Sequence, residues 1–173
     1  IAQKAFPAVR PISMLIHPDS KIDSHTQYRR WVKLILDRWV MHFEENDDLD
    51  SKDYRVPADL LRAIKEMERT CSINDFFSDS EDSTKQLIRL IRYWITSDSI
   101  EVRVVNSERP HHNVAPDEWP TKAGWILIGA GKLDRGFVVE KLAVTYMPRG
   151  RGGGNVDTIQ QRGRFFGYKK PYL

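Results

Sequence analysis

The sequence contains a single cysteine, Cys71, among its 173 residues. One cysteine cannot form an internal disulfide, and it excludes a zinc site built from several cysteines of this chain. Such low cysteine usage is typical of proteins from a reducing compartment. We therefore expect a cytoplasmic or nucleoid-associated protein in which Cys71 is a buried thiol.

Long apolar runs are also missing. No stretch of about 18 apolar residues is present, so the sequence predicts no membrane-spanning helix. The first residues, IAQKAFPAVRP, lack the basic-then-apolar order of a secretory signal peptide. With 40% apolar residues the chain can bury one sizeable core, and we expect a globular domain without membrane contact.

A complete phosphate-binding loop is absent as well. The Walker pattern G-x-x-x-x-G-K-[ST] requires a first glycine and a final hydroxyl. Around Gly131-Lys132 these two positions are occupied by Ile126 and Leu133. We therefore do not expect the chain to hydrolyse a nucleoside triphosphate by itself.

The sequence does contain a strongly uneven charge distribution. Residues 41–83 hold 13 acidic and 5 basic side chains, a net charge of −8. Residues 121–173 hold 10 basic and 3 acidic side chains, a net charge of +7. Clustered Lys and Arg displace counterions from a phosphate backbone, so the C-terminal third favours nucleic acid or a nucleotide as its partner.

Hydrophobic periodicity predicts both strands and helices. Segments rich in Val, Ile and aromatic residues predict strands at 12–19, 100–107, 125–130 and 141–147. Helical spacing predicts helices from Ser24 to Phe43 with a Ser24–Gln27 capping box, from Pro57 to Met67, from Ser83 to Thr96, and from Asn155 or Asp157 onward. The acidic segment 44–53 and the proline-rich segment 108–122 are expected to be loops.

Nearly continuous apolar strands separated by helices indicate an α/β fold with a parallel sheet and helices on both faces. We expect one domain over residues 1–173, with a helical insertion at about 44–98. In open parallel sheets, ligands bind beyond the carboxyl ends of the strands. Residues 129–135, residues 149–155 and His17 are therefore expected at one functional edge.

Two segments resemble motifs V and VI of the second RecA-like domain of superfamily two helicases. They are GAGKLDRGFVVEKLAVTYMPR, residues 129–149, and DTIQQRGRFFGY, residues 157–168. In that family a strand leads to an Arg-Gly turn, here Arg135-Gly136, and a later helix carries Q-x-x-G-R, here Gln160 to Arg164.

The combination of LDRGFVVE, LAVTYMPR and DTIQQRGRFFGY is similar to a narrower family, the Z-one (Z1) domain, an endonuclease-associated module joined to a helicase-type ATPase. The specific part of this resemblance is the last 50 residues. Two departures from the general helicase pattern agree with the narrower family. Gly167 replaces the usual second arginine of motif VI, for which Arg162 or Lys169 could substitute, and Val138 replaces a common acid.

The resemblance implies a site for ATP and Mg²⁺ shared with an N-terminal RecA-like domain of the same parent chain, which would supply the Walker loop and the acidic magnesium ligand. Arg164 would contact the γ-phosphate, and Gln160 would orient water or phosphate. Further nucleotide contacts are implied for Asp134, Arg135, Gly136 and Gly163. Candidate contacts with the nucleic-acid backbone, expected to be DNA, are His17, Lys132, Arg149 and Arg162.

The sequence therefore predicts the second motor domain of an ATP-dependent helicase or translocase, inactive as an isolated fragment. One alternative is a non-catalytic DNA- or protein-binding module. Another is part of a restriction-type endonuclease, although the nearest E-x-K pattern, residues 101–103, ends in Arg103. No metal site is predicted, because the adjacent His111 and His112 point apart in an extended loop.

Overall fold

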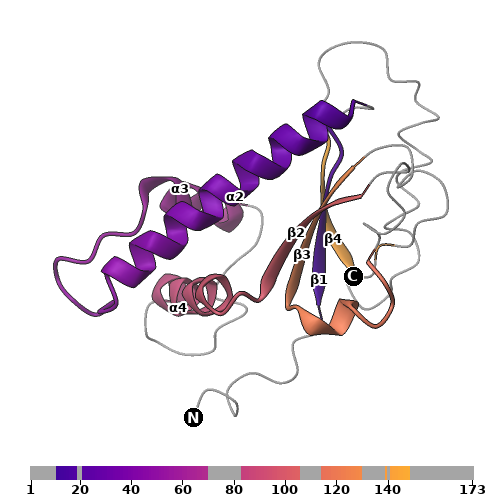
Figure 1. The fold of residues 1–173 in the computed structure, drawn as a ribbon. Helices are drawn as coiled ribbons and strands as arrows, with labels where there is room; N and C mark the ends of the chain where they lie inside the picture. The colour runs from indigo at the N-terminus through magenta and orange to yellow at the C-terminus, as the bar shows by residue number, and fades with distance from the viewer. Residues whose placement is uncertain are drawn as a thin grey trace. The chain divides into compact units, whose positions relative to one another are not determined.

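The computed structural model describes residues 11–18, 21–69, 83–105, 114–129, 139 and 141–148. The elements in chain order are β1 (Ile12–Ile16), α2 (Ile22–Glu45), α3 (Ala58–Glu68), α4 (Ser83–Thr96), β2 (Ile100–Val105), the 3-10 helix η3 (Trp119–Thr121), β3 (Gly124–Gly129) and β4 (Leu142–Tyr146) (Figure 1). The helix expected beyond Asn155 lies outside the described residues.

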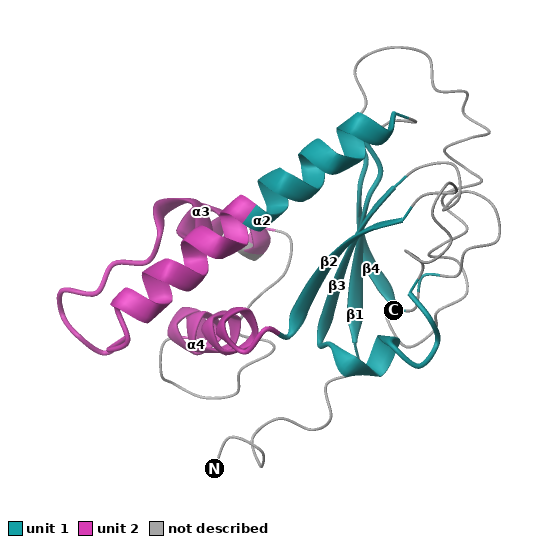
Figure 2. Cartoon of the chain, in the orientation of Figure 1, with its two compact units in different colours: residues 1–33, 99–173 teal, residues 34–98 magenta. Residues whose placement is uncertain are grey.

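The chain divides into two compact units (Figure 2). One consists of Ile1–Lys33 together with Ser99–Leu173, and the other of Leu34–Asp98. The second unit contains the segment 44–98 that was expected as a helical insertion, and it also takes in the C-terminal part of α2.

The first unit contains a four-stranded sheet with the order β2-β3-β1-β4. All three strand pairs are parallel, and Ile12 lies opposite Gly124 while Ile16 lies opposite both Ile128 and Tyr146. The register between β1 and β4 shifts between Ser13 and Met14. The predicted α/β fold with a parallel sheet is therefore confirmed, and each strand falls inside or within one residue of its predicted segment.

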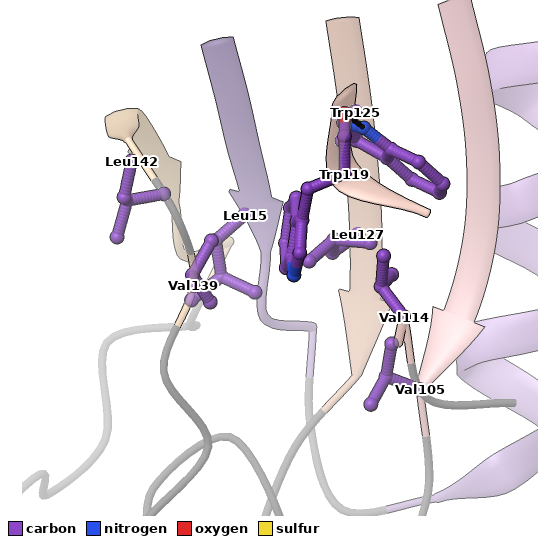
Figure 3. Packing of buried hydrophobic residues seen from close by; sticks show 8 residues of the cluster. All are labelled: Leu15, Val105, Val114, Trp119, Trp125, Leu127, Val139 and Leu142. Atoms are coloured by element: carbon purple, nitrogen blue, oxygen red, sulfur yellow. Dashed lines mark hydrogen bonds between the residues drawn. The ribbon is translucent and has the colours of Figure 1, made fainter. Parts of the chain in front are cut away.

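A hydrophobic core covers one face of this sheet (Figure 3). Trp119 and Trp125 meet edge to face with ring centroids 5.4 Å apart, and the indole N–H of Trp125 donates to the Trp119 carbonyl at 3.1 Å. The core consists of Leu15, Val105, Val114, Trp119, Trp125, Leu127, Val139 and Leu142. Part of the segment expected as a plain proline-rich loop thus folds back as η3 and supplies core side chains, because burying an indole is strongly favourable.

The second unit has its own hydrophobic core, formed by α2, α3 and α4. Phe43, Leu60, Ile64 and Ile88 are each at most 5% exposed. On α3, Leu60 and Ile64 are four residues apart, so both lie on the same helix face. This spacing explains why the helical periodicity of the sequence predicted α3 correctly. In α4 the buried residues Ile88 and Ile95 are seven apart, which again places them on one helix face.

Ion pairs anchor the acidic segment after α2 to helix α4 of the same unit. Both carboxylate oxygens of Asp50 accept from Arg89, at 2.9 and 3.0 Å, and Asp50 also pairs with Lys85. Arg92 donates to the carbonyl of Asp47. The hydrogen bonds from Lys85 and Arg89 lower the pKa of Asp50. Helix α2 continues to Glu45, two residues into the predicted loop, and the rest of the segment is a loop that is fixed to a helix.

The predicted capping box at Ser24 and Gln27 is wrong. Helix α2 begins at Ile22, so Ser24 is the third helical residue. The backbone N–H of His25 already donates to the carbonyl of Lys21, at 3.4 Å, which closes a helical turn before Ser24 could act as a cap. In α3, Pro57 is the N-cap residue, with φ −50° and ψ 131°, and its carbonyl accepts the N–H of Leu61 at 2.9 Å.

Candidate functional site

The four strands end at one edge of the sheet because they all run in the same direction. Their last residues are Ile16 in β1, Val105 in β2, Gly129 in β3 and Tyr146 in β4. Strands β3 and β4 lie on either side of β1, so their ends are about two strand spacings, or roughly 10 Å, apart. Ligands of open parallel sheets bind beyond this edge, which makes it the candidate site.

His17 directly follows β1 at this edge. Its backbone N–H donates to the carbonyl of Tyr146 at 2.8 Å, which ties the end of β1 to the end of β4. The imidazole is only 2% exposed. Contact of this side chain with a nucleic-acid phosphate would therefore require neighbouring residues to move, and that role of His17 stays a prediction.

Thr145 is a polar residue of this edge that the sequence interpretation missed. It lies opposite Leu15 in the β1–β4 register and therefore shares a sheet face with Leu15 and, two residues on, His17. Its Oγ1 is buried and has no hydrogen-bond partner among the described residues. The sheet face that carries the hydrophobic core thus ends in polar side chains. The signal in the sequence was a threonine near the end of an otherwise apolar strand, which could have indicated a polar residue at the sheet edge.

Of the ten residues predicted to contact nucleotide or nucleic acid, His17 alone lies within the described residues. The other nine lie outside them: Lys132, Asp134, Arg135, Gly136, Arg149, Gln160, Arg162, Gly163 and Arg164. Two of these follow described strands closely in the sequence. Lys132 comes three residues after the end of β3 at Gly129, and Arg149 comes three residues after the end of β4 at Tyr146.

A comparison with protein families gives one match, which spans residues 2–173 and is described as the Z1 domain. The chain belongs to the Z1 domain family. The predicted membership of the Z1 family, made from the motifs of the last 50 residues, is thereby confirmed. The match also extends through the helices of the second unit. No curated protein and no solved structure matches the chain.

A second polar cluster of this Z1 domain lies within the first unit and has a structural role. Arg103 on β2 donates to both carboxylate oxygens of Glu118, at 3.0 and 2.9 Å, and its guanidinium lies 5.0 Å from the Trp125 ring centroid. Glu118 also accepts the backbone N–H of Ala115 at 2.7 Å. The hydrogen bond from Arg103, followed by the one from Ala115, lowers the pKa of Glu118.

The nearest E-x-K pattern, on which the endonuclease alternative would depend, includes Arg103 of this cluster. Arg103 stands where the nearest E-x-K pattern would need its lysine, and its guanidinium is engaged by Glu118 and Trp125. Among the described residues of the Z1 domain, no group of three or more His, Cys, Asp or Glu side chains is arranged to hold a metal ion. Within the same ranges, every helix is too short or too polar to cross a bilayer.

Proposed function

We propose that this Z1 domain is the second motor domain of an ATP-dependent helicase or translocase that acts on nucleic acid. The observation that carries the proposal is the strand order, in which β3 and β4 flank β1. The segment that resembles motif V begins at the end of β3 and finishes just beyond β4. Its two ends therefore start from the same edge of the sheet.

Chain geometry supports a shared phosphate site at this edge. The ends of β3 and β4 are roughly 10 Å apart, and three residues of extended chain span at most about 11 Å. Lys132 and Arg149, three residues beyond these ends in the sequence, would thus be able to reach one phosphate group. The unpartnered hydroxyl of Thr145 at the same edge fits a polar ligand.

The residues of this chain would act mainly by positioning and by charge. ATP would supply the transferred phosphoryl group, with Mg²⁺ held mainly by the N-terminal RecA-like domain of the same parent chain. Lys132 would donate to a phosphate, and residues 134–136 together with Gly163 would contact the nucleotide. Arg164 would stabilise the negative charge that develops on the γ-phosphate oxygens, while Gln160 would orient the attacking water.

Nucleic-acid binding would draw on the net charge of +7 of residues 121–173. Arg149 and Arg162 would bind successive backbone phosphates, with DNA as the expected substrate. The two RecA-like domains of the parent chain would close on ATP, and this closing would be coupled to movement along the nucleic acid. Such a function would locate the protein in the cytoplasm or at the nucleoid.

The first test is ATP hydrolysis by the intact protein in the presence and absence of DNA. Replacing Arg164 with alanine should lower the DNA-stimulated turnover at least a hundredfold, because an arginine at the γ-phosphate contributes about 10³ to 10⁵ in rate. DNA binding should be retained. The matched control is Arg62→Ala, since Arg62 is an exposed arginine on α3.

Unchanged turnover in Arg164→Ala would remove this residue from the chemistry. An intact protein that binds DNA without hydrolysing ATP, and without any effect of nucleotide on binding, would favour a non-catalytic DNA- or protein-binding module. Metal-dependent cutting of DNA would revive the endonuclease alternative.

A further inference from the structure

Helix α2 carries apolar side chains on two sides. On one side Phe43 is fully buried and belongs to the core of the second unit. The other side carries four exposed large apolar residues, with exposed fractions between 41% and 59%: Trp31, Leu34, Ile35 and Met41. A helix that packs against one core needs only one apolar stripe. Contiguous exposed apolar residues mark an interaction surface, so the second stripe points to a further partner.

Helix geometry places these four side chains on one surface. Leu34 and Ile35 follow Trp31 by three and four residues, and Met41 follows Leu34 by seven, which are spacings of neighbours on one helix face. At 100° per residue, all four lie within an arc of about 120°. Because α2 is one continuous helix, their relative positions follow from the helix itself. We call this surface the α2 stripe.

A line of charged side chains borders the α2 stripe on one side. Asp23, Arg30, Asp37 and Glu44 are all exposed and follow one another at intervals of seven residues, which places them close to one line along the helix. Neither Arg30 nor Glu44 has an ion-pair partner among the described residues. They cannot pair with each other within one copy, because the fourteen residues between these positions rise about 21 Å.

We infer that the α2 stripe is the contact surface of a symmetric dimer, in which α2 of a second copy packs antiparallel against it. The twofold axis of such a pair brings the same border of both helices together. Arg30 of each copy then lies near Glu44 of the other, so the interface contains two opposite-charge pairs. A parallel pair would bring the charged border against the opposite border of the stripe, where α2 carries no acidic residue.

Apolar contact supplies the affinity of this dimer, and the charges supply its orientation. Near the axis the two copies of Asp37 repel each other, but the two Arg30–Glu44 pairs outnumber this single repulsive contact. Arg38, which lies within the stripe, keeps its own partner Asp59. One helix pair is a small interface, so we expect a dissociation constant in the micromolar range. The inference does not rest on the proposed function, because a motor domain and a binding module can both pair in this way.

The test is the molar mass of the intact protein, measured by sedimentation equilibrium over a series of protein concentrations up to about 1 mM, without nucleotide or nucleic acid. Wild type should form dimers that dissociate on dilution. Ile35→Lys should weaken the dimer roughly tenfold or more, because the twofold axis puts two unpaired charges into the apolar contact. The matched control is Met67→Lys on α3, since Met67 is 39% exposed and Ile35 is 41% exposed. This control should leave the dissociation constant unchanged.

Charge reversal identifies the partner as a second copy. Arg30→Glu and Glu44→Arg should each weaken the dimer by roughly tenfold, because each change turns two attractive pairs into repulsive ones. The double variant Arg30→Glu, Glu44→Arg has the net charge of wild type and should recover its affinity, since the pairs form again with exchanged signs. A partner other than a second copy would not give this recovery.

A wild type that stays monomeric throughout the series would overturn the inference. So would a dimer that Ile35→Lys weakens no more than Met67→Lys does, and so would charge-reversal variants without recovery. A monomer in which Ile35→Lys alone lowers the unfolding midpoint would instead assign the α2 stripe to a segment of the parent chain. Circular dichroism checks that each variant is folded. Met41→Lys, at a position that is 59% exposed, replaces Ile35→Lys if that variant is unfolded.

Discussion

Thr145 shows what the burial of one hydroxyl says about a site. Its Oγ1 is buried near the carboxyl end of β4, where no hydrogen-bond partner is found in the part of the chain that the structure describes. Leaving a buried polar group unsatisfied costs about 1–3 kcal/mol. A polar ligand that accepts from or donates to this hydroxyl would remove that cost, which is the residue-level argument for a polar ligand at the sheet edge.

Replacing Thr145 with valine should therefore leave the free energy of unfolding unchanged or raise it by up to about 1 kcal/mol, because the methyl group matches the shape and removes the unsatisfied hydroxyl. Urea denaturation of the intact protein without ligands measures this change. Ser13→Ala is the control, since Ser13 is 1% exposed and its hydroxyl is not among the unsatisfied buried groups of the described residues. It should destabilise. A loss of more than 1 kcal/mol in Thr145→Val would mean that the hydroxyl is hydrogen-bonded after all.

At the scale of elements, the segment 114–121 is held onto the sheet by one ion pair and two indoles. Glu118 joins β2 through Arg103 and the start of the segment through the N–H of Ala115. The lowered pKa of Glu118 means that its ionised form is favoured in the folded protein. The stabilisation is fully present above the ordinary pKa of 4.5 and is lost as the pH falls through the lower folded-state value.

Glu118→Gln should consequently flatten the pH dependence of stability below pH 5, with a modest loss of stability at pH 7, since this carboxylate is 38% exposed and well screened. Thermal unfolding midpoints measured from pH 7 to pH 3 report the effect. Asp117→Asn, at the exposed neighbouring position, serves as the control and should preserve the wild-type profile. Parallel profiles for wild type and Glu118→Gln would contradict the assignment.

The elements also show which structure a sequence can specify locally. Helix α4 spans Ser83–Thr96, as its apolar spacing predicted, and the strands follow their Val and Ile runs. The start of α2 was predicted two residues late because Ser24, followed by Gln27, fits the capping-box pattern. In the structure the N–H of His25 donates to the carbonyl of Lys21, so the helix has already begun before Ser24. The burial of Trp119 and the pairing of Arg103 with Glu118 depend on contacts across the fold, which no local pattern contains.

At the scale of the whole molecule, the described residues form two separate hydrophobic cores, one in each unit. Cores that share no side chains can open with different free energies. The motifs of the last 50 residues were sufficient to identify the family, because their residue types and spacing are specific. The site itself could be predicted only as far as the edge of the sheet, since nine of the ten predicted contact residues lie outside the described residues.

Ile64→Ala should therefore destabilise the second unit selectively. Ile64 is 3% exposed, and loss of such a side chain costs about 2–5 kcal/mol. Hydrogen exchange should accelerate for amides of α3 and α4 by a larger factor than for amides of β1 and β3. The control is Leu34→Ala, at a position that is 56% exposed in the same unit. Equal acceleration in both units would show that they unfold as one.

The position of β1 in the sheet has a consequence for how the protein forms during translation. β1 is made first, yet it lies between β3 and β4, and its residue Ile12 pairs with Gly124, more than 100 residues later. Closing so long a loop is slow, whereas the core of 34–98 needs only contacts between neighbouring helices. On the ribosome the helical unit can therefore fold before β3 and β4 are available to pair with β1. Until then β1 is an unpaired apolar strand that a chaperone would have to shield.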